Sequence, residues 1–144
     1  VSPDAHNAYV AAVDERHGGR AKALIRYIKA WKYLRGAPIS SFYLEMRVAK
    51  YADGEKVIIP DIDVARVLRE LWDHQLASMQ DPMGFSGYIQ ACKTEAQRAD
   101  ALSKLERAVG RAAKARQCTV NQDIAGAFDW WRLLYDDQFP NYYY

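Results

Sequence analysis

The sequence predicts an all-α fold, a bundle of about six helices. Apolar residues recur at intervals of three and four over most of the chain, which is typical of helices that bury one face. Capping residues, glycine and proline separate these periodic stretches. A β-branched run at residues 57–59 would be a lone strand without a partner. With 144 residues, 50% of them hydrophobic, the chain is long enough for one domain with its own core.

Each predicted helix has a recognisable start or end. Thr94 and Gln97 form a capping box at the start of the fifth helix. The third helix begins at Ser40 or Ser41, and it is apolar nearly all round, which predicts a central and buried position. The predicted helices cover residues 3–15, 20–34, 40 or 41 to 51, 61–79, 94–116 and 121–135.

The apolar stripes predict which side chains face the core, and turn-forming residues predict the main loop. Residues 80–87 contain two glycines, a proline and an aspartate, which indicates a loop before the fifth helix. The inward side chains predicted for the fourth and sixth helices are Leu68, Leu71, Trp72, Leu76, Ile124, Phe128 and Trp131.

Composition and charge exclude several classes of protein. Twenty Lys and Arg against eighteen Asp and Glu give a net charge of +2, so the chain as a whole is not a strongly basic nucleic-acid binder. No apolar run approaches the roughly 20 residues that cross a bilayer, so we expect no membrane partner. Cys92 and Cys118 indicate no disulfide framework and favour a cytoplasmic location. The histidines are far apart and no Cys-x-x-Cys pair occurs, so we expect no zinc or other metal site.

The residues best suited to hold a phosphate lie in the segment LIRYIKAWKYLRGAPISSFYLE. Arg26 and Lys29 share a polar helical face, and a lysine at the border of an apolar stripe presents its ammonium over the neighbouring element. That element begins with Ser40 and Ser41, where backbone N–H groups and the helix dipole also attract anions. Phe42 could stack on a base. A structural explanation stays open, in which the serines only cap the helix and Phe42 belongs to the core.

Three further charged groups have both a functional and a structural explanation. Glu45 either supports the phosphate site or forms a structural ion pair. Asp61 and Asp63 have the spacing of metal-holding carboxylates, but acids also stabilise the first turn of a helix, which is the favoured explanation here. The fifth helix carries a basic stripe that would face either a polyanion or solvent, formed by Lys104, Arg107, Arg111 and Lys114.

Six stretches that follow one another over nearly the whole chain carry a family resemblance. They are PDAHNAYV, LIRYIKAWK, PISSFYLEM, MQDPMGF, the alanine-rich fifth helix and FDWWRLLYDDQFPNYYY. Together they resemble the C-terminal helical half of the cGAS-like nucleotidyltransferases, in particular the bacterial oligonucleotide cyclases called CD-NTases, which are related to oligoadenylate synthetase.

The resemblance implies a two-lobed transferase that joins nucleoside triphosphates into cyclic di- or trinucleotides, second messengers of antiviral defence in bacteria. Lys29 and Ser41, with Ser40 beside them, would contact the triphosphate, and Phe42 would stack on the base. Mg²⁺ would be held mainly by an N-terminal β-sheet lobe that carries a Gly-Ser motif and paired carboxylates. This chain contains no such lobe and begins at Val1, so we expect residues 1–144 to be a nucleotide-binding fragment that is inactive alone.

A second hypothesis stays open, in which the chain is a non-catalytic helical module. Such a module would bind a protein partner or nucleic acid through the basic fifth helix and the aromatic tail. Under the first hypothesis, the partners are instead nucleoside triphosphates and the missing N-terminal lobe. It also predicts self-association of the fragment, because the surface that faces the missing lobe would be uncovered.

Overall fold

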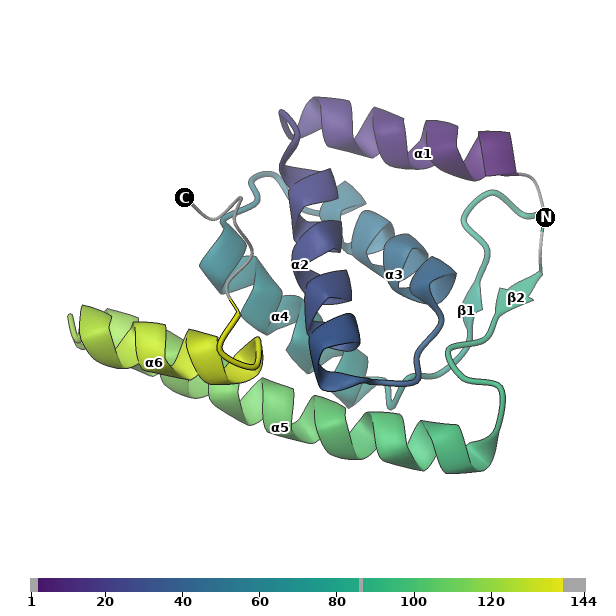
Figure 1. The fold of residues 1–144 in the computed structure, drawn as a ribbon. Helices are drawn as coiled ribbons and strands as arrows, with labels where there is room; N and C mark the ends of the chain where they lie inside the picture. Colours follow the sequence, from purple (N-terminus) through teal and green to yellow (C-terminus); the bar gives the residue numbers. More distant parts are fainter. Residues whose placement is uncertain (1–2, 86, 139–144) are drawn as a thin grey trace.

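The computed structural model describes residues 3–85 and 87–138, and it confirms the all-α bundle of about six helices. The aromatic tail at residues 139–144 lies outside the described residues. None of the described helices is both long and apolar enough to cross a membrane. The elements are α1 (Pro3–Arg16), α2 (Arg20–Arg35), α3 (Ser41–Asp53), α4 (Pro60–Asp73), β1 (Met79–Gln80), β2 (Tyr88–Ile89), α5 (Glu95–Val120) and α6 (Ile124–Leu134) (Figure 1).

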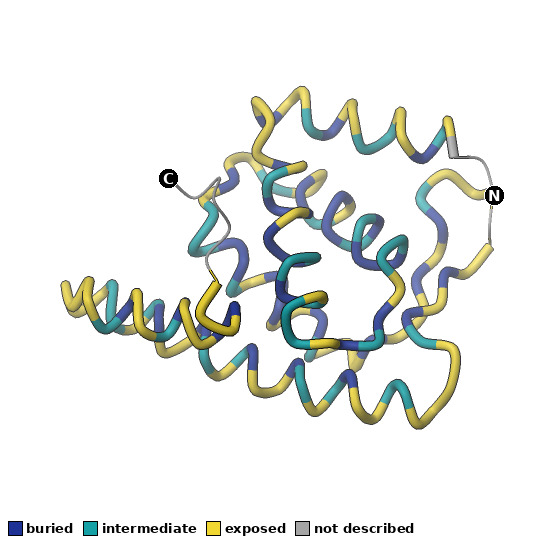
Figure 2. Tube along the Cα trace, viewed as in Figure 1, coloured by how far each residue is buried: buried dark blue, intermediate teal, exposed yellow. Residues whose placement is uncertain are grey.

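Helix α3 is buried over most of its surface, as its apolar sequence predicts. Helices α1 and α2 both pack against it, α4 contacts α2 and α5, and α6 runs along α5 at one edge of the molecule (Figure 1). Buried positions are concentrated on α2, α3 and α4, where the helices face one another (Figure 2). Each large apolar side chain buried there contributes about 1.5–3 kcal/mol. The buried residues of α3 are Tyr43, Leu44, Met46, Val48, Ala49 and Ala52.

A short connection brings the end of α2 next to the start of α3. Gly36 adopts a left-handed conformation, with φ of 64°, which ends α2 and reverses the chain. Ser40 then caps α3, because its hydroxyl oxygen accepts a hydrogen bond from the backbone N–H of Tyr43 at 3.3 Å. The Ser40 N–H donates to the carbonyl of Ala91 at 2.8 Å. The start of α3 is therefore anchored both to its own first turn and to the segment that precedes α5.

The fourth helix is shorter than the sequence predicts, because it ends at Asp73 and not at residue 79. Gln75 and Leu76 adopt a left-handed conformation, with φ of 54° at each. The N–H of Leu76 donates to the carbonyl of Leu71 at 3.2 Å, a six-to-one bond that closes a helix end. Neither residue is a glycine, so the usual stop signal is missing. Leu76 is buried as predicted, but it reaches the core from this turn.

The predicted loop at residues 80–87 connects the strands of a small antiparallel hairpin. Met79 pairs with Ile89 and Gln80 with Tyr88, and two-residue strands are too short to leave a periodic pattern in the sequence. Residues 57–59 do not form a strand in the described structure. Ile58 is buried there between exposed neighbours, so this extended segment attaches the start of α4 to the core.

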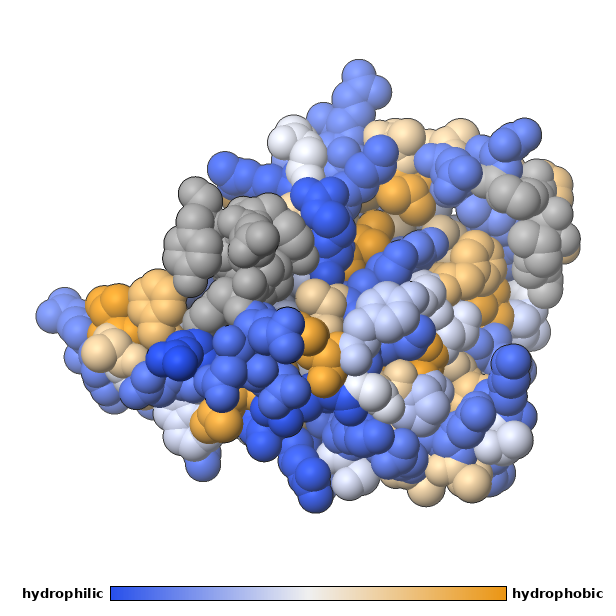
Figure 3. All heavy atoms as spheres, in the orientation of Figure 1, coloured by the Kyte–Doolittle hydropathy of each residue, from blue (hydrophilic) through white to orange (hydrophobic). Residues whose placement is uncertain are grey.

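The predicted inward face of the sixth helix is wrong at two positions. Trp131 is buried as expected, but Ile124 and Phe128 are 55% and 45% exposed. Helix α6 packs mainly on α5 and buries the narrower stripe of Ala127, Trp131 and Leu134. Val120, at the end of α5, is also exposed, and hydrophobic atoms gather at this outer end of the α5 and α6 pair (Figure 3).

Candidate functional site

Lys29 and Glu45 form an ion pair between α2 and α3. The Lys29 Nζ donates to Glu45 Oε1 at 2.6 Å, and both side chains are partly exposed. Glu45 lies one turn into α3, so the structure places the Lys29 ammonium beside that turn and not against the hydroxyl of Ser41. The carboxylate has the structural partner that its place in an apolar helix requires.

Lys32 occupies the place over the start of α3 that sequence reasoning assigned to Lys29. Its Nζ donates to the Ser41 Oγ at 3.0 Å, and the Tyr33 hydroxyl lies 2.9 Å from the same oxygen. Lys32 lies one helical turn after Lys29 in the last turn of α2. Its place one turn after Lys29 was the sequence signal that could have identified Lys32. The α2–α3 cluster is defined here as Lys29, Lys32, Tyr33, Ser41 and Glu45.

The electrostatics of the α2–α3 cluster favour negative charge. The pKa of the Tyr33 phenol is lowered, first by its hydrogen bond with Ser41 and then by the positive charge of Lys32. Because the Ser41 oxygen accepts from Lys32, the hydroxyl hydrogen of Ser41 is available to Tyr33. In the contact between Ser41 and Tyr33 either hydroxyl can be the donor. When Ser41 donates, the hydrogen bond stabilises the phenolate form of Tyr33.

The remaining predicted site residues surround this cluster. Ser40 is the cap of α3, as described above. Phe42 is half-buried against the core, and the imidazole of His6 meets its ring edge-on, with 4.9 Å between ring centroids. Arg26 is exposed on α2. It shares an open surface hollow of about 300 Å³ with Asn7, Val10, Lys22, Ile25 and Glu45.

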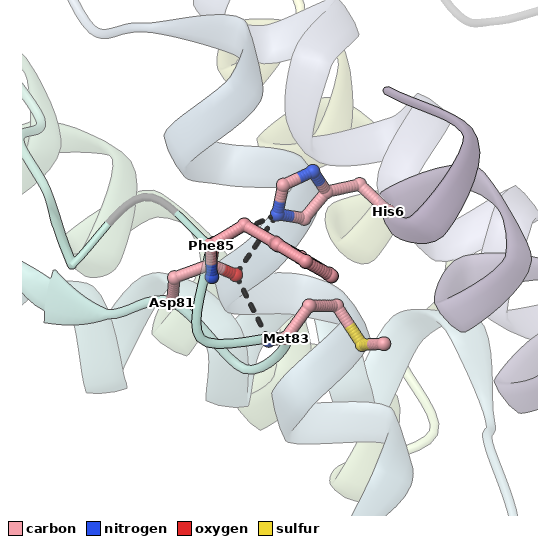
Figure 4. A network of polar contacts seen from close by, with 4 residues as sticks. All are labelled: His6, Asp81, Met83 and Phe85. Carbon is pink, nitrogen blue, oxygen red and sulfur yellow. Dashed lines mark hydrogen bonds and ion pairs between the residues drawn. The ribbon is translucent and has the colours of Figure 1, made fainter. Parts of the chain in front are cut away.

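A buried hydrogen-bonded pair that sequence reasoning missed connects α1 to the hairpin loop near the cluster (Figure 4). His6 Nε2 lies 2.9 Å from both carboxylate oxygens of Asp81, and the two residues are 2% and 3% exposed. The partners are 75 positions apart in the sequence, so no local pattern could indicate them.

Asp61 and Asp63 hold the start of α4, in agreement with the structural explanation. Asp61 pairs with Arg116 of α5 at 2.6 Å. The buried Asp63 accepts from the N–H of Ile59 at 2.6 Å and from the Tyr51 hydroxyl. Burial, and then the hydrogen bond to Asp63, raise the pKa of Tyr51. Within residues 3–85 and 87–138, no three His, Cys, Asp or Glu side chains are grouped so that they could hold a metal ion.

The basic stripe of α5 is partly engaged within the molecule. Lys104 donates to the carbonyl of Gly36 at 3.0 Å and to Asp100 at 2.9 Å. Lys114 lies over the ring of Trp130, 4.6 Å from its centroid. Burial, and then the nearby charge of Arg35, lower the pKa of Arg111, so positive charge is concentrated where α2 ends against α5.

Comparison with known proteins gives no further evidence about the function of this chain. No protein-family model, no curated protein and no solved structure matches the chain. The chemistry of the α2–α3 cluster is therefore the main structural support for any functional assignment.

Proposed function

We propose that this chain is the nucleotide-holding helical lobe of a nucleotidyltransferase, and that it binds a nucleoside triphosphate at the α2–α3 cluster. One observation carries the proposal, the 3.0 Å contact between Lys32 Nζ and Ser41 Oγ at the first residue of α3. A phosphate oxygen can accept the hydrogen bond that the serine oxygen now accepts. The first-turn N–H groups and the positive end of the helix dipole add to the attraction.

The ion pair of Lys29 and Glu45 supplies a second positive charge. A partly exposed pair contributes only about 0–1 kcal/mol, so little is lost when its lysine turns toward a phosphate. Lysine acts on phosphate as a mobile point charge, which suits a site where the ammonium changes partners. Lys29 and Lys32 would then hold the triphosphate from one side while Ser41 fixes one of its oxygens.

The lobe would bind and position its substrate without transferring a proton. Holding a reactant in place can supply a large part of a catalytic effect. Mg²⁺ would arrive with the triphosphate and neutralise its charge. The described residues offer no ligand set for the ion, because no group of acidic or histidine side chains converges there, so no step of this lobe is assigned to it.

The sequence resemblance supports the rest of the proposal. An intact cytoplasmic enzyme would combine this lobe with an N-terminal catalytic lobe and make cyclic di- or trinucleotides in antiviral signalling. Phe42 immediately follows Ser41, so a base could stack on it while the phosphates occupy the cluster. The chain alone is then a binding lobe without turnover.

Calorimetric titration with ATP tests the binding site. We expect Lys32→Ala to weaken ATP binding by roughly tenfold or more, since a charge-assisted hydrogen bond is worth about 1.5–3 kcal/mol. Lys50→Ala is the matched control, because Lys50 is an exposed lysine in the last turn of α3. Wild-type protein that does not bind ATP, or equal losses in the two variants, would contradict the proposal.

The alternative function, a non-catalytic module that binds a polyanion or protein through α5, is favoured by the positive charge around Arg111. Arg35 and Arg107 both lower the pKa of this guanidinium, while Asp136, which pairs with Arg35, raises it, so three arginines and one acid share this region. Charge reversal by Arg107→Glu would abolish binding to a short RNA or DNA duplex under this alternative. Indifference of that binding to Lys32→Ala would separate it from the first proposal.

A further inference from the structure

A buried carboxylate fixes the hairpin loop between β1 and β2. Asp81 accepts hydrogen bonds from the backbone N–H groups of Met83 at 2.9 Å and Phe85 at 3.0 Å (Figure 4). Its own N–H donates to the carbonyl of Gly87 at 2.7 Å, and its carbonyl accepts from Gly84 at 3.0 Å. An aspartate that bonds the backbone two and four residues later holds a loop in one conformation. The position of the Phe85 backbone is therefore determined.

His6 completes this arrangement from α1. Its Nε2 contacts both oxygens of Asp81 at 2.9 Å, while its buried Nδ1 has no hydrogen-bond partner among the described residues. Burying these polar groups loses solvation that an apolar pair of similar size would not lose. The loss of solvation and the Nδ1 atom without a described partner are better explained by a positioning role of His6 than by a gain in stability.

Two phenylalanine rings lie against the imidazole that this pair immobilises. The centroid of the Phe42 ring is 4.9 Å from that of His6, and the Phe85 centroid is 6.4 Å away, both in edge-on geometry. Phe85 is 59% exposed although its backbone is fixed, so the loop presents an aromatic ring to solvent. Phe42 is the neighbour of Ser41, so both rings lie on the side of the molecule where α3 begins.

We propose that Phe85 is a second base-contacting side chain, facing the nucleobase together with Phe42, and that His6 and Asp81 are the positioning residues that hold it there. This inference rests on the proposed function, because it assigns the base-binding part of the same site. It predicts a ligand that carries a planar aromatic ring on a polyphosphate. It also predicts that the hairpin loop contributes to binding through the aromatic ring of the ligand and not through the charge of its phosphates.

Binding of ATP compared with inorganic tripolyphosphate, measured by calorimetry, tests the inference. Tripolyphosphate carries the charge without the base. Phe85→Leu keeps apolar area and removes the aromatic ring, and we expect it to weaken ATP binding roughly tenfold, since stacking on an aromatic ring is worth about 1–3 kcal/mol per base. Tripolyphosphate binding should be unchanged. Phe85→Tyr should restore ATP binding, and Tyr88→Leu, at an exposed aromatic on the same hairpin, should leave it unchanged.

Two variants of His6 test the positioning role. His6→Ala removes the contact with Asp81, and we expect a loss of ATP binding similar to that of Phe85→Leu, without loss of tripolyphosphate binding. His6→Gln places an amide donor near the position of Nε2 and should retain most of the ATP affinity. Circular dichroism of each variant identifies a protein that has lost its fold. If a His6 variant does not fold, the variants of the exposed Phe85 still test whether this ring contacts the base.

The outcomes separate this inference from the proposed function. If Lys32→Ala weakens both ligands while Phe85→Leu changes neither, the phosphate site stands and the role of Phe85 is overturned. Equal weakening of both ligands by Phe85→Leu also overturns it, since the effect would then not concern the base. If wild-type protein binds neither ligand, the proposed function falls and the base site with it.

Discussion

Lys29 of α2 and Glu45 of α3 lie 2.6 Å apart, from Nζ to Oε1, one turn into α3 from Ser41. This carboxylate places a negative charge close to the proposed triphosphate. It also occupies one of the two lysines that would bind it. The Glu45 carboxylate therefore either weakens anion binding by repulsion or strengthens it by orienting Lys29. Neutralising Glu45 would tighten ATP binding in the first case and weaken it in the second.

We expect Glu45→Gln to tighten ATP binding by roughly threefold, because an exposed charge interaction is worth about 0.2–1 kcal/mol. The gain should shrink at high salt, which screens charges. Lys29→Met is the matched variant and should weaken binding. Calorimetry at low and high salt measures both. Weaker ATP binding to Glu45→Gln would show that the carboxylate orients Lys29.

The lowered pKa of Tyr33 gives a prediction that needs no ligand. The hydrogen bond with Ser41 and the charge of Lys32 favour the phenolate, so Tyr33 should ionise below the usual tyrosine value of about 10. Because the folded state favours the deprotonated form, this interaction stabilises the fold increasingly as the pH rises through the lowered pKa. NMR of tyrosines labelled at Cζ follows the titration.

Two variants assign the early titration to Tyr33 and test whether Lys32 causes it. Tyr33→Phe should remove the early titration, and Lys32→Met should move it toward the usual value. ATP affinity should also fall as Tyr33 ionises, since the phenolate adds a negative charge beside the phosphates. An unchanged titration in Lys32→Met would show that this ammonium does not act on the phenol.

The buried carboxylate of Asp63 is expected to stabilise the fold and to have no part in metal binding. Asp63→Ala removes the acceptor of the Ile59 N–H and the nearer acceptor of the Tyr51 hydroxyl, which also reaches Glu55 at 3.5 Å. We expect the free energy of unfolding to fall by about 2–4 kcal/mol, since each unsatisfied buried group costs about 1–3 kcal/mol. Urea unfolding measures it. Asp73→Ala, at an exposed acid of the same helix, should change stability by less than about 0.5 kcal/mol.

The left-handed turn after α4 predicts a stabilising substitution. Gln75 has φ of 54°, and a residue with a Cβ pays about 1–2 kcal/mol in that conformation. Gln75→Gly should raise the free energy of unfolding by roughly 0.5–1 kcal/mol. The lost hydrogen bond from the Gln75 side chain to the Trp72 carbonyl offsets part of the gain. Glu70→Gly, inside α4, should instead lower stability by about 1 kcal/mol, and thermal unfolding compares the two. A lower stability of Gln75→Gly would mean that the side-chain hydrogen bond outweighs the backbone strain.

Local signals predicted the helices well where the stop and start residues were present. Thr94 caps α5 as expected, with its oxygen accepting from the N–H of Gln97 at 3.1 Å, and Gly36 ends α2. The end of α4 was missed because its closing turn uses Gln75 and Leu76, which carry no sequence signal for positive φ. The inward face of α6 was wrong because one packed neighbour selects a narrower stripe than a general apolar periodicity suggests.

The sequence by itself determined the fold class, the approximate helices and the place where a phosphate site should be sought, because periodicity and caps act over a few residues. Only the tertiary structure decided which lysine meets Ser41. The turn at Gly36 and the packing of α2 on α3 place Lys32 there and pair Lys29 with Glu45. Only the folded chain could bring His6 to Asp81, since hydrogen bonds between distant segments depend on how whole helices pack.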